Sequence, residues 1–582
     1  MSNDLGIDRS GNDNSWTVNN MAFSDQVVDS PTNNFATWNP LQYGWNYTPV
    51  YTEGNTKISF TNAGAYGHGY GTIGGLKSGK WYWETLVNAQ GTDTRIGIAG
   101  QVTGSDGEAD VWRQYIDNLN DGNGKNKNGG FDNSYGSSFT SGDIIGLAVD
   151  IDNGTIAFYK NNSSQGTAYT DILSAMPDDG WMPHSSGYNT STITTNFGQD
   201  SSFAGAKTAQ GNQDGNDIGD FYYTPPTGFL ALCTSNLPEP AVKPAENFNT
   251  VIYTGNATAR SITGVGFQPD WVWIKNRAAT ENHTIYDVLR GAEIRLASDA
   301  NDGEDDRGSY GLTAFGADGF TIGTGGELNG NNQAIVAWNW KAGGSGVSAS
   351  NLTGVGTATI SANTDAGFSI VKWTSTQGGP VSYGHGLSQT PEFVITKSVT
   401  DDDYWGVGHE SLGWDKAWNL NDRRTAVDST AYWNDTSPTS TIVALGGGVN
   451  NNKRFITYNF HSVDGYQKFG KYLGNQSDDG PFIYLGFKPA YLVIFSITTQ
   501  DDGHLILDAA REPDNRVDLL LYVSNTDAEA DNSGTTGTTS RGIDFVSNGF
   551  KIRGANSLVN YSSREYAYWA IAETPFKHSN AR

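Results

Sequence analysis

The stretch that decides the fold is residues 142–161, GDIIGLAVDIDNGTIAFYKN, in which two apolar runs flank the triplet Asp152-Asn153-Gly154. In the second run, Ile156 and Phe158 alternate with smaller or more polar neighbours, which is the two-residue period of a half-buried strand. Asn and Gly tolerate the positive φ angles that a tight hairpin turn requires. The stretch therefore predicts a β-hairpin.

The composition extends this prediction to the whole chain. Aromatic residues make up 12% of the 582 residues and charged residues only 17%, and there are 73 glycines. Many aromatic and few charged residues fit thin β-sandwich cores joined by turns, and the length predicts about three to five domains. We expect an all-β, multidomain protein. The single cysteine, Cys233, is expected to be a small buried core residue.

The charge of the chain argues against nucleic-acid partners, and its hydropathy pattern argues against membrane insertion. The formal net charge is −26, so the chain should repel phosphate backbones, and its sequence has no basic stripe. It also has no run of about 18 apolar residues, so membrane insertion is not expected. The first residues, MSNDLGIDRSGNDNSW, lack an apolar signal core, which predicts synthesis in a cytoplasm.

Breaks in composition divide the chain into segments. Residues 1–34 are polar and rich in Asn and Asp, three prolines fall within 238–244, and Gly343-Gly344-Ser345-Gly346 has the composition of a flexible connection. We predict, in order, an extended N-terminal arm (1–34), a β-sandwich (35–235), a Pro-rich linker (236–246) and three β-modules (247–345, 350–470 and 471–582).

The three modules are predicted from an internal repeat. A glycine, an apolar residue and a nearby proline introduce an apolar run three times, starting at Gly266, Gly386 and Gly486. An aromatic residue in a closing strand follows after 72, 72 and 83 residues, at Trp338, Tyr458 and Trp569. Markers in one order at near-constant spacing indicate homologous modules.

Five motifs in the predicted sandwich resemble those of a SPRY domain. They are GKWYWE (79–84), RIGIA (95–99), GDIIGLAVD (142–150), NGTIAFYKN (153–161) and TTNFG (194–198). Their order and spacing are similar to the family's over residues 35–235. The resemblance implies a concanavalin-like, bent β-sandwich.

Other stretches resemble virion proteins of marine tailed phages, of the kind commonly labelled tail fibres. They are GFQPDWVWIKNR (266–277), WNDT (433–436), NFHS with DGY (459–466), PFK with SNAR (575–582) and SPTNNFAT (30–37). The resemblance implies a phage structural protein that is made in the host bacterial cytoplasm and located in the virion. It also implies other virion proteins as partners and a homo-oligomer, with a trimer expected.

The sequence offers no persuasive catalytic constellation. The eight histidines are scattered, and no two have the spacing of a zinc-binding helix. Residues 69–74 formally fit GxGxxG, but an all-β context favours turns over a dinucleotide site. We therefore expect no enzyme activity. Two acidic runs, Asp299–Asp306 and Asp401–Asp403, could bind Ca²⁺, and the alternative is that they are solvated loops.

Aromatic and polar residues in loops are the candidates for ligand binding, because rings stack on sugar faces and amides bond hydroxyls. In the predicted sandwich the candidates are Trp112, Tyr115, Trp181, His184 and Tyr188. A second group, in the middle module, is Trp405, Trp414, Trp418, Tyr432 and Trp433. The alternative for both groups is that they are core or subunit-interface residues.

Three functions remain open at this point. The first is a tail fibre or host-adhesion appendage that binds a cell-surface glycan or protein. The second is an architectural role, as a capsid fibre, a decoration protein or a tail adaptor. The third and least favoured is a polysaccharide-cleaving enzyme, which would need two carboxylates about 5–10 Å apart in a sugar-binding cleft.

Overall fold

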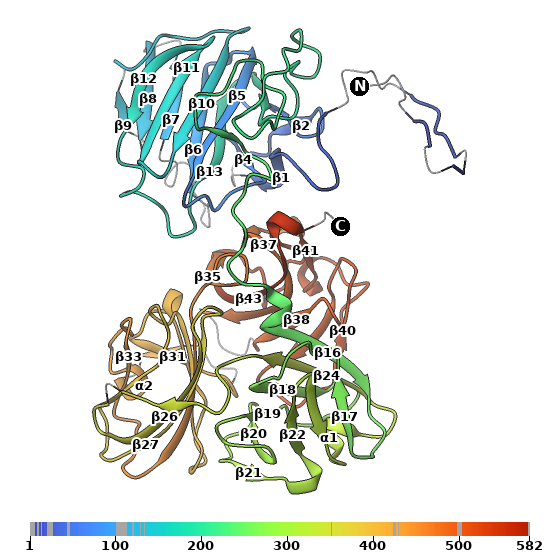
Figure 1. Cartoon of the computed structure of the whole chain (residues 1–582), viewed down its shortest axis with the longest axis vertical. Helices are drawn as coiled ribbons and strands as arrows, with labels where there is room; N and C mark the ends of the chain where they lie inside the picture. The colour runs from blue at the N-terminus through green and yellow to red at the C-terminus, as the bar shows by residue number, and fades with distance from the viewer. Residues whose placement is uncertain are drawn as a thin grey trace. The chain divides into compact units, whose positions relative to one another are not determined.

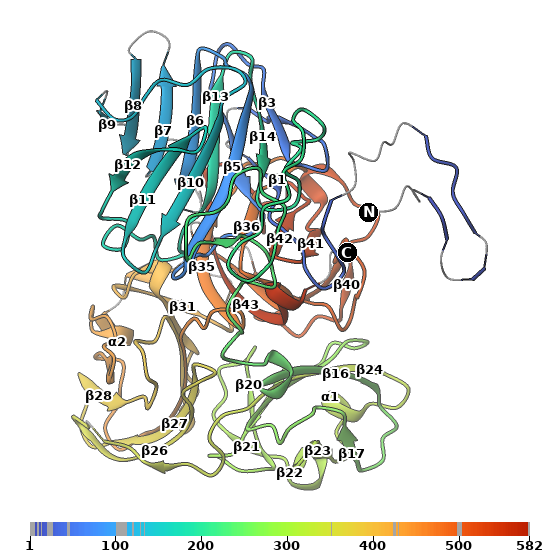
Figure 2. The same cartoon turned by 45° about the horizontal axis from the view of Figure 1, so that its top comes forward.

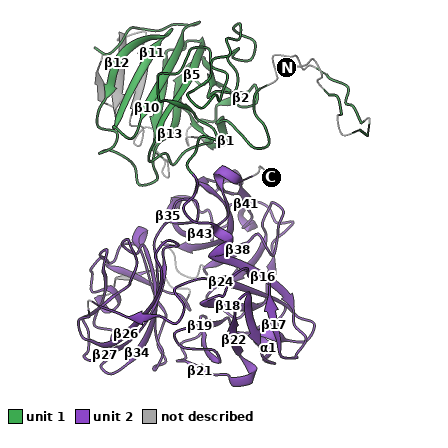
Figure 3. Ribbon diagram, in the orientation of Figure 1, with its two compact units in different colours: residues 1–238 green, residues 239–582 purple. Residues whose placement is uncertain are grey.

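Figure 1 shows the computed structural model of the chain, which separates into two compact units, residues 1–238 and 239–582 (Figure 3). The structure describes residues 6–579 except 9–10, 13, 20–26, 44–46, 101–112, 119–121, 128–129, 133, 351, 423–425, 429 and 498–502. Side chains at 43, 113–118, 122–127, 130–132 and 427–428 also lie outside the description. The unit boundary falls inside the Pro-rich segment 236–246.

Unit 1 is built from two antiparallel sheets (Figure 2). The first has the order β1 (Trp38–Tyr43), β4 (Gly67–Gly71), β13 (Met182–Tyr188), β6 (Asp93–Ala99), β7 (Arg113–Asn118), β8 (Gly122–Lys127) and β9 (Gly130–Asp132). The second has the order β12 (Ser163–Tyr169), β11 (Thr155–Lys160), β10 (Ile144–Asp150), β5 (Lys80–Ala89), β14 (Ser191–Asn196), β3 (Lys57–Phe60) and β2 (Val50–Thr52), and β15 (Leu230–Ala231) pairs with β5 in parallel.

The predicted hairpin is confirmed. Strands β10 and β11 pair from Asp150 opposite Thr155 to Ile145 opposite Lys160, and Gly154 in the turn has a φ of 71°. Ile156 and Phe158 are fully buried. The alternation in the sequence therefore reports the core-facing side of the strand.

The two ends of unit 1 pair with each other. Phe35 and Cys233 form an antiparallel bridge, flanked by hydrogen bonds from the Ala36 amide to Leu232 and from the Thr234 amide to Asn34, both 2.9 Å. Cys233 is fully buried, as the sequence predicted. The SPTNNFAT motif therefore joins the first and last segments of the sandwich.

Unit 2 contains three sets of sheets that share one strand order. The first set is β16 (Phe248–Thr254), β24 (Ala334–Trp340), β18 (Trp271–Asn276), β19 (Thr284–Asp287), β20 (Ile294–Ala297) and β21 (Asp305–Asp306). The third set is β35 (Gln467–Leu473), β43 (Glu565–Pro575), β37 (Phe487–Ser496), β38 (Leu505–Asp508), β39 (Leu519–Tyr522) and β40 (Ala530–Asp531). The middle set has the same order, β27 (Phe368–Ser375), β34 (Arg454–Phe460), β29 (Phe393–Ser398), β30 (Gly406–His409), β31 (Lys416–Asn419) and β32 (Val427–Asp428), extended at the first edge by β26 (Val355–Asn363) and β25 (Val347–Ser348).

A smaller sheet accompanies each set. In the first and third it is three-stranded, β17 (Arg260–Thr263), β23 (Gly319–Ile322), β22 (Leu312–Gly316) and β36 (Phe482–Tyr484), β42 (Gly549–Ile552), β41 (Ile543–Val546). Gly319 and Gly549 stand where a Cβ would meet a neighbouring carbonyl at 2.1 and 2.0 Å, so the repeated Gly-Phe pair has a steric reason. The middle module lacks the triplet Asp-Gly-Phe or Asn-Gly-Phe to which these pairs belong, and among its described residues the sheet has two strands, β28 (Val381–Gly384) and β33 (Ile442–Leu445).

The proline of each repeat does not always precede its strand. Pro269 and Pro391 lie just before β18 and β29, as expected for residues without an N–H. Pro489 instead lies inside β37, at a point where the register with β43 shifts. A bulge tolerates the missing donor there. The prediction that the proline introduces the strand is therefore wrong for the third module.

Helices are short. Those among the described residues are α1 (Gly326–Asn329), α2 (Thr430–Trp433) and the 3₁₀ turns η2 (Pro244–Glu246), η3 (Gly308–Tyr310), η4 (Glu410–Leu412), η5 (Gly537–Thr539) and η6 (Phe576–His578). In the part of the chain that the structure describes, no helix has the length and apolarity needed to cross a membrane. The prediction of an all-β fold is confirmed.

The three modules of unit 2 share one hydrophobic core. Besides a separate cluster in each module, a central cluster takes buried residues from all three, among them Trp271, Phe393 and Trp569. Gly343 and Gly344 are not a free connection, because their amides donate to Ser361 and Asp270 at 2.8 and 3.2 Å. Unit 2 is therefore one packed body, in which three lobes surround a common centre (Figure 1).

Candidate functional site: a polar face on unit 1

The candidate site lies on the first sheet of unit 1, where β13 runs between β4 and β6. Ser186 of β13 is paired with His68 of β4 on one side and with Arg95 of β6 on the other. Two residues away, His184 is paired with Tyr70 and with Gly97. Directly paired residues share a face of a sheet, so these side chains form one continuous patch.

The patch lies on the face of the sheet that points away from the second sheet. A Cβ at Gly67 or Gly69 would meet Phe60 or Ile58 of the second sheet, at 2.7 and 2.3 Å. These glycines therefore face the sandwich core and let the sheets approach closely. Since side chains alternate along a strand, His68 and Tyr70 point to the opposite side.

The two histidines form a buried, neutral pair. Nδ1 of His68 lies 3.2 Å from Nε2 of His184, and both side chains are almost completely buried. Burial, with a smaller contribution from Arg95, lowers the pKa of His68 to about 4, and burial lowers the pKa of His184 well below its usual value. Both rings are therefore uncharged at pH 7, and one ring nitrogen donates to the other.

A buried ion pair lies beside the histidines. Nη2 of Arg95 is 2.8 Å from Oδ2 of Asp93, and the hydroxyl of Tyr66 donates to the same oxygen at 2.7 Å. The guanidinium of Arg95 lies 4.2 Å above the ring of Tyr66, which contacts Tyr188 with ring centroids 5.3 Å apart. Tyr66 and Tyr188 are half-buried, so they form the accessible edge of the patch.

Two polar atoms of the patch have unused hydrogen-bonding capacity. Oδ1 of Asp93 and Oγ of Ser186 are buried and, among the described residues, have no hydrogen-bond partner. Buried polar groups usually find partners, and an exception calls for an explanation. Because both atoms are buried, a ligand would contact the patch at its half-buried edge, where the rings of Tyr66 and Tyr188 are suited to stack on a sugar face.

The structure brings two of the five predicted ligand residues into this patch, His184 and Tyr188. Trp181 is fully buried, and its Nε1 donates to the carbonyl of Ile172 at 3.1 Å, so it presents no surface to a ligand. Trp112 lies outside the described residues. Tyr115 belongs to β7 opposite Ile96, but its side chain lies outside the description.

Four residues of the patch, His68, Asp93, Arg95 and Tyr66, were not predicted from the sequence. They come from two segments that are distant from β13 in the chain, so no local motif joins them. The signal that existed was the polar run His184-Ser185-Ser186 inside a strand, which indicates a sheet face covered by polar groups.

The second group of predicted ligand residues lies in the cores of unit 2. Trp405 and Trp418 belong to the central cluster, and Trp414 and Trp433 belong to the cluster of the middle module. Their exposed fractions are 7% or less. Only Tyr432 is half-buried, and its hydroxyl donates to Asn419 at 2.7 Å. These tryptophans therefore fill cores.

The acidic runs proposed for Ca²⁺ lie next to each other, and a lysine occupies the space between them. The Nζ of Lys397 donates to the carbonyls of Asn301, Asp401 and Asp403 at 2.8, 3.1 and 2.9 Å. Burial lowers the pKa of Lys397 to about 8, so it is mostly charged at pH 7. The described residues contain no group of three or more His, Cys, Asp or Glu that could hold a metal ion.

Comparisons with known proteins first define the class of unit 1. A model of the SPRY domain matches residues 80–200, so the chain carries a SPRY domain. The SPRY domain of human HERC1 is 19% identical, with a TM-score of 0.23, over 27% of this chain and 96% of that one. A further human SPRY domain is 18% identical, with a TM-score of 0.21, over 26% and 95%.

The second comparison identifies the family. A model described as a domain of unknown function, DUF7483, matches residues 243–575, and the chain belongs to this family. The ATP-dependent RNA helicase DDX1 of Xenopus laevis is 30% identical over 181 residues, which cover 31% of this chain and 20% of the helicase. The chain thus spans a fifth of the length of that relative.

Proposed function

We propose that this protein is a structural protein of a tailed-bacteriophage virion, a tail fibre or another host-adhesion appendage, and that unit 1 binds a glycan or protein on the host surface. The observation that carries the proposal is the patch on unit 1. Its half-buried rings, Tyr66 and Tyr188, lie beside Oδ1 of Asp93 and Oγ of Ser186, which are buried and have no partner in the part of the chain that the structure describes. The resemblance of the C-terminal repeats to phage virion proteins supports the proposal that the protein is part of a phage particle.

The chemistry of the patch favours binding over catalysis. The histidines are held neutral by burial, so neither can act as an acid near pH 7. The carboxylate of Asp93 is engaged by Arg95 and Tyr66, whereas a glycosidase acid or base must be free to exchange a proton with its substrate. We therefore propose a non-catalytic protein that needs no cofactor.

Binding is tested with the purified chain on glycan arrays and on candidate host cells. Tyr188→Ala should reduce binding at least about tenfold, because an aromatic anchor at an interface contributes at least 1–2 kcal/mol. Tyr310→Ala is the matched control, since Tyr310 is 61% exposed and lies in unit 2. Equal binding by wild type and Tyr188→Ala, or no binding to any cell or glycan, would refute the assignment.

One observation favours the architectural alternative, a capsid fibre, decoration protein or tail adaptor. Trp16, in the N-terminal arm, has an exposed fraction of 82%, whereas every other described tryptophan is exposed by 7% or less. An exposed tryptophan on a polar arm is suited to dock into another virion protein. Imaging of the particle distinguishes the two functions, because a position away from any host contact would favour the architectural role.

A further inference from the structure

The three modules of unit 2 contact one another in a repeating, directional way. In each module, the closing strand is β24, β34 or β43, and the strand after the apolar run is β19, β30 or β38. The hydroxyl of Tyr458 on β34 donates to Asp287 on β19 at 2.9 Å. Nε1 of Trp338 on β24 donates to Asp508 on β38 at 3.0 Å. The second module thus contacts the first, and the first contacts the third.

The third contact of this kind completes the cycle. Nε2 of His409, on β30 of the middle module, lies 3.2 Å from the carbonyl of Tyr568 on β43. All three junctions therefore join the closing strand of one module (β24, β34 or β43) to the strand that follows the apolar run of another (β19, β30 or β38). Each module contacts one neighbour through its closing strand and the other neighbour through the strand that follows its apolar run.

A second set of contacts repeats the cycle. Lys275 and Lys397 occupy the same position in β18 and β29, and each reaches a carbonyl of the preceding module in the cycle, Thr526 at 3.1 Å and Asn301 at 2.8 Å. In β37 this position is Phe495, whose ring stacks on Trp418 of the middle module at 5.2 Å. The third junction is therefore apolar where the other two are charged.

A face that contacts a different face of its neighbour is heterologous, and a series of such contacts closes into a ring when the rotation is right. We infer that residues 248–575 are a ring of three modules closed within one chain. The partner of each module face is the next module of the same chain. The central core of Trp271, Phe393 and Trp569 lies where the three modules meet.

Closure of the ring has a consequence for assembly. The faces through which separate modules would trimerise are already occupied, at the high effective concentration of a single chain. The chain is therefore monomeric through unit 2, and each ring carries one SPRY domain where a homotrimer would carry three. The inference is independent of the proposed function, and it replaces the homotrimer that the resemblance to phage proteins implies.

The mass of the full chain tests the inference directly. Light scattering after size-exclusion chromatography should give about 62.5 kDa across a wide concentration range. Three times that mass would overturn the inference. A failure of the binding proposal leaves this result unchanged, so the two can be distinguished.

Opening one junction provides a second test. The double variant Tyr458→Phe with Lys397→Met removes two contacts between the first and second modules, and Lys471→Ala, which removes an exposed ion pair with Glu565, is the control. Concentration-dependent self-association of the double variant, or faster amide exchange in all three modules together, supports a ring. Unchanged mass and exchange, or faster exchange in one module alone, contradicts it.

Discussion

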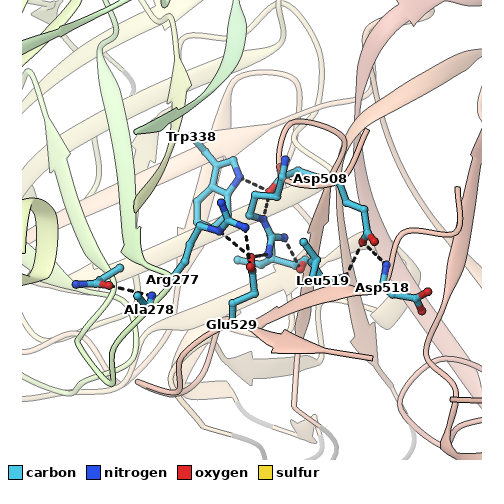
Figure 4. A network of polar contacts seen from close by, with 11 residues as sticks. Arg277, Ala278, Trp338, Asp508, Asp518, Leu519 and Glu529 are labelled. Carbon is cyan, nitrogen blue, oxygen red and sulfur yellow. Dashed lines mark hydrogen bonds and ion pairs between the residues drawn. The ribbon is translucent and has the colours of Figure 1, made fainter. Parts of the chain in front are cut away.

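Removing one carboxylate at the junction of the first and third modules should destabilise the whole of unit 2. Asp508 and Arg511 have exposed side-chain fractions of 0%. Oδ2 of Asp508 accepts hydrogen bonds from Nε of Arg511 at 2.5 Å and from Nε1 of Trp338 at 3.0 Å, and Oδ1 accepts from the Arg511 amide at 2.9 Å (Figure 4). The variant Asp508→Ala deletes both acceptor oxygens and so removes all three hydrogen bonds.

The size of the effect follows from what remains. Breaking a buried ion pair typically costs about 3–5 kcal/mol, because it leaves an unpaired buried charge. Arg511 would keep Glu529, 2.8 Å from Nη1, and the carbonyl of Ile506, 3.0 Å from Nη2. We therefore expect a loss of about 3 kcal/mol, at the lower end of that range.

The assay is urea unfolding of the full chain, followed by tryptophan fluorescence with the m-value held common. Glu565→Ala is the control. The ion pair between Glu565 and Lys471 is also short, at 2.7 Å, but the side chains of Lys471 and Glu565 are 45% and 40% exposed. An exposed pair contributes about 0–1 kcal/mol. If Asp508→Ala were no less stable than Glu565→Ala, the assignment of this network to the junction would be refuted.

Three further predictions concern buried ionisable groups. Lys397→Met should cost about 2–3 kcal/mol in urea unfolding, because the buried lysine donates three hydrogen bonds to carbonyls and all three are lost. Burial lowers the pKa of His385, His409 and His504 to about 4. Their contribution to stability is therefore present above pH 6.5 and is lost as the pH falls toward 4. The free energy of unfolding should be lower at pH 5 than at pH 7.5 by roughly 2 kcal/mol per histidine. Burial raises the pKa of Glu84 to about 7, so unit 1 should lose about 3 kcal/mol as the pH rises from 4.5 to above 7, and Glu84→Gln should remove this dependence in pH-resolved unfolding.

Features of the fold that depend on residues close together in the sequence could be predicted from the sequence. The hairpin around Asn153-Gly154 needs only a turn and an alternating strand, and both are local. The three repeats were also predictable, because the glycine, apolar residue and proline near each apolar run recur at Gly266, Gly386 and Gly486. Packing of the repeats into a single core was not readable, since an apolar strand does not specify which module covers it.

The candidate site was only half predictable, for a related reason. His184 and Tyr188 stand in one strand with visible polar character, but His68 and Arg95 join them from strands that are remote in the chain. Trp405 and Trp418 were candidates for binding because they are aromatic and clustered in sequence. Residue type alone does not distinguish an aromatic side chain that stacks on a ligand from one that fills a core. In this chain Trp405 and Trp418 belong to the central core shared by the three modules.

Native-state hydrogen exchange on the intact chain tests the closed ring most directly. Strands β24, β34 and β43 contribute side chains to the core shared by the three modules. Their amides should exchange at one common slow rate, because the ring opens only as a whole. Three clearly separate rates would mean that the modules unfold independently, and that result would contradict the account.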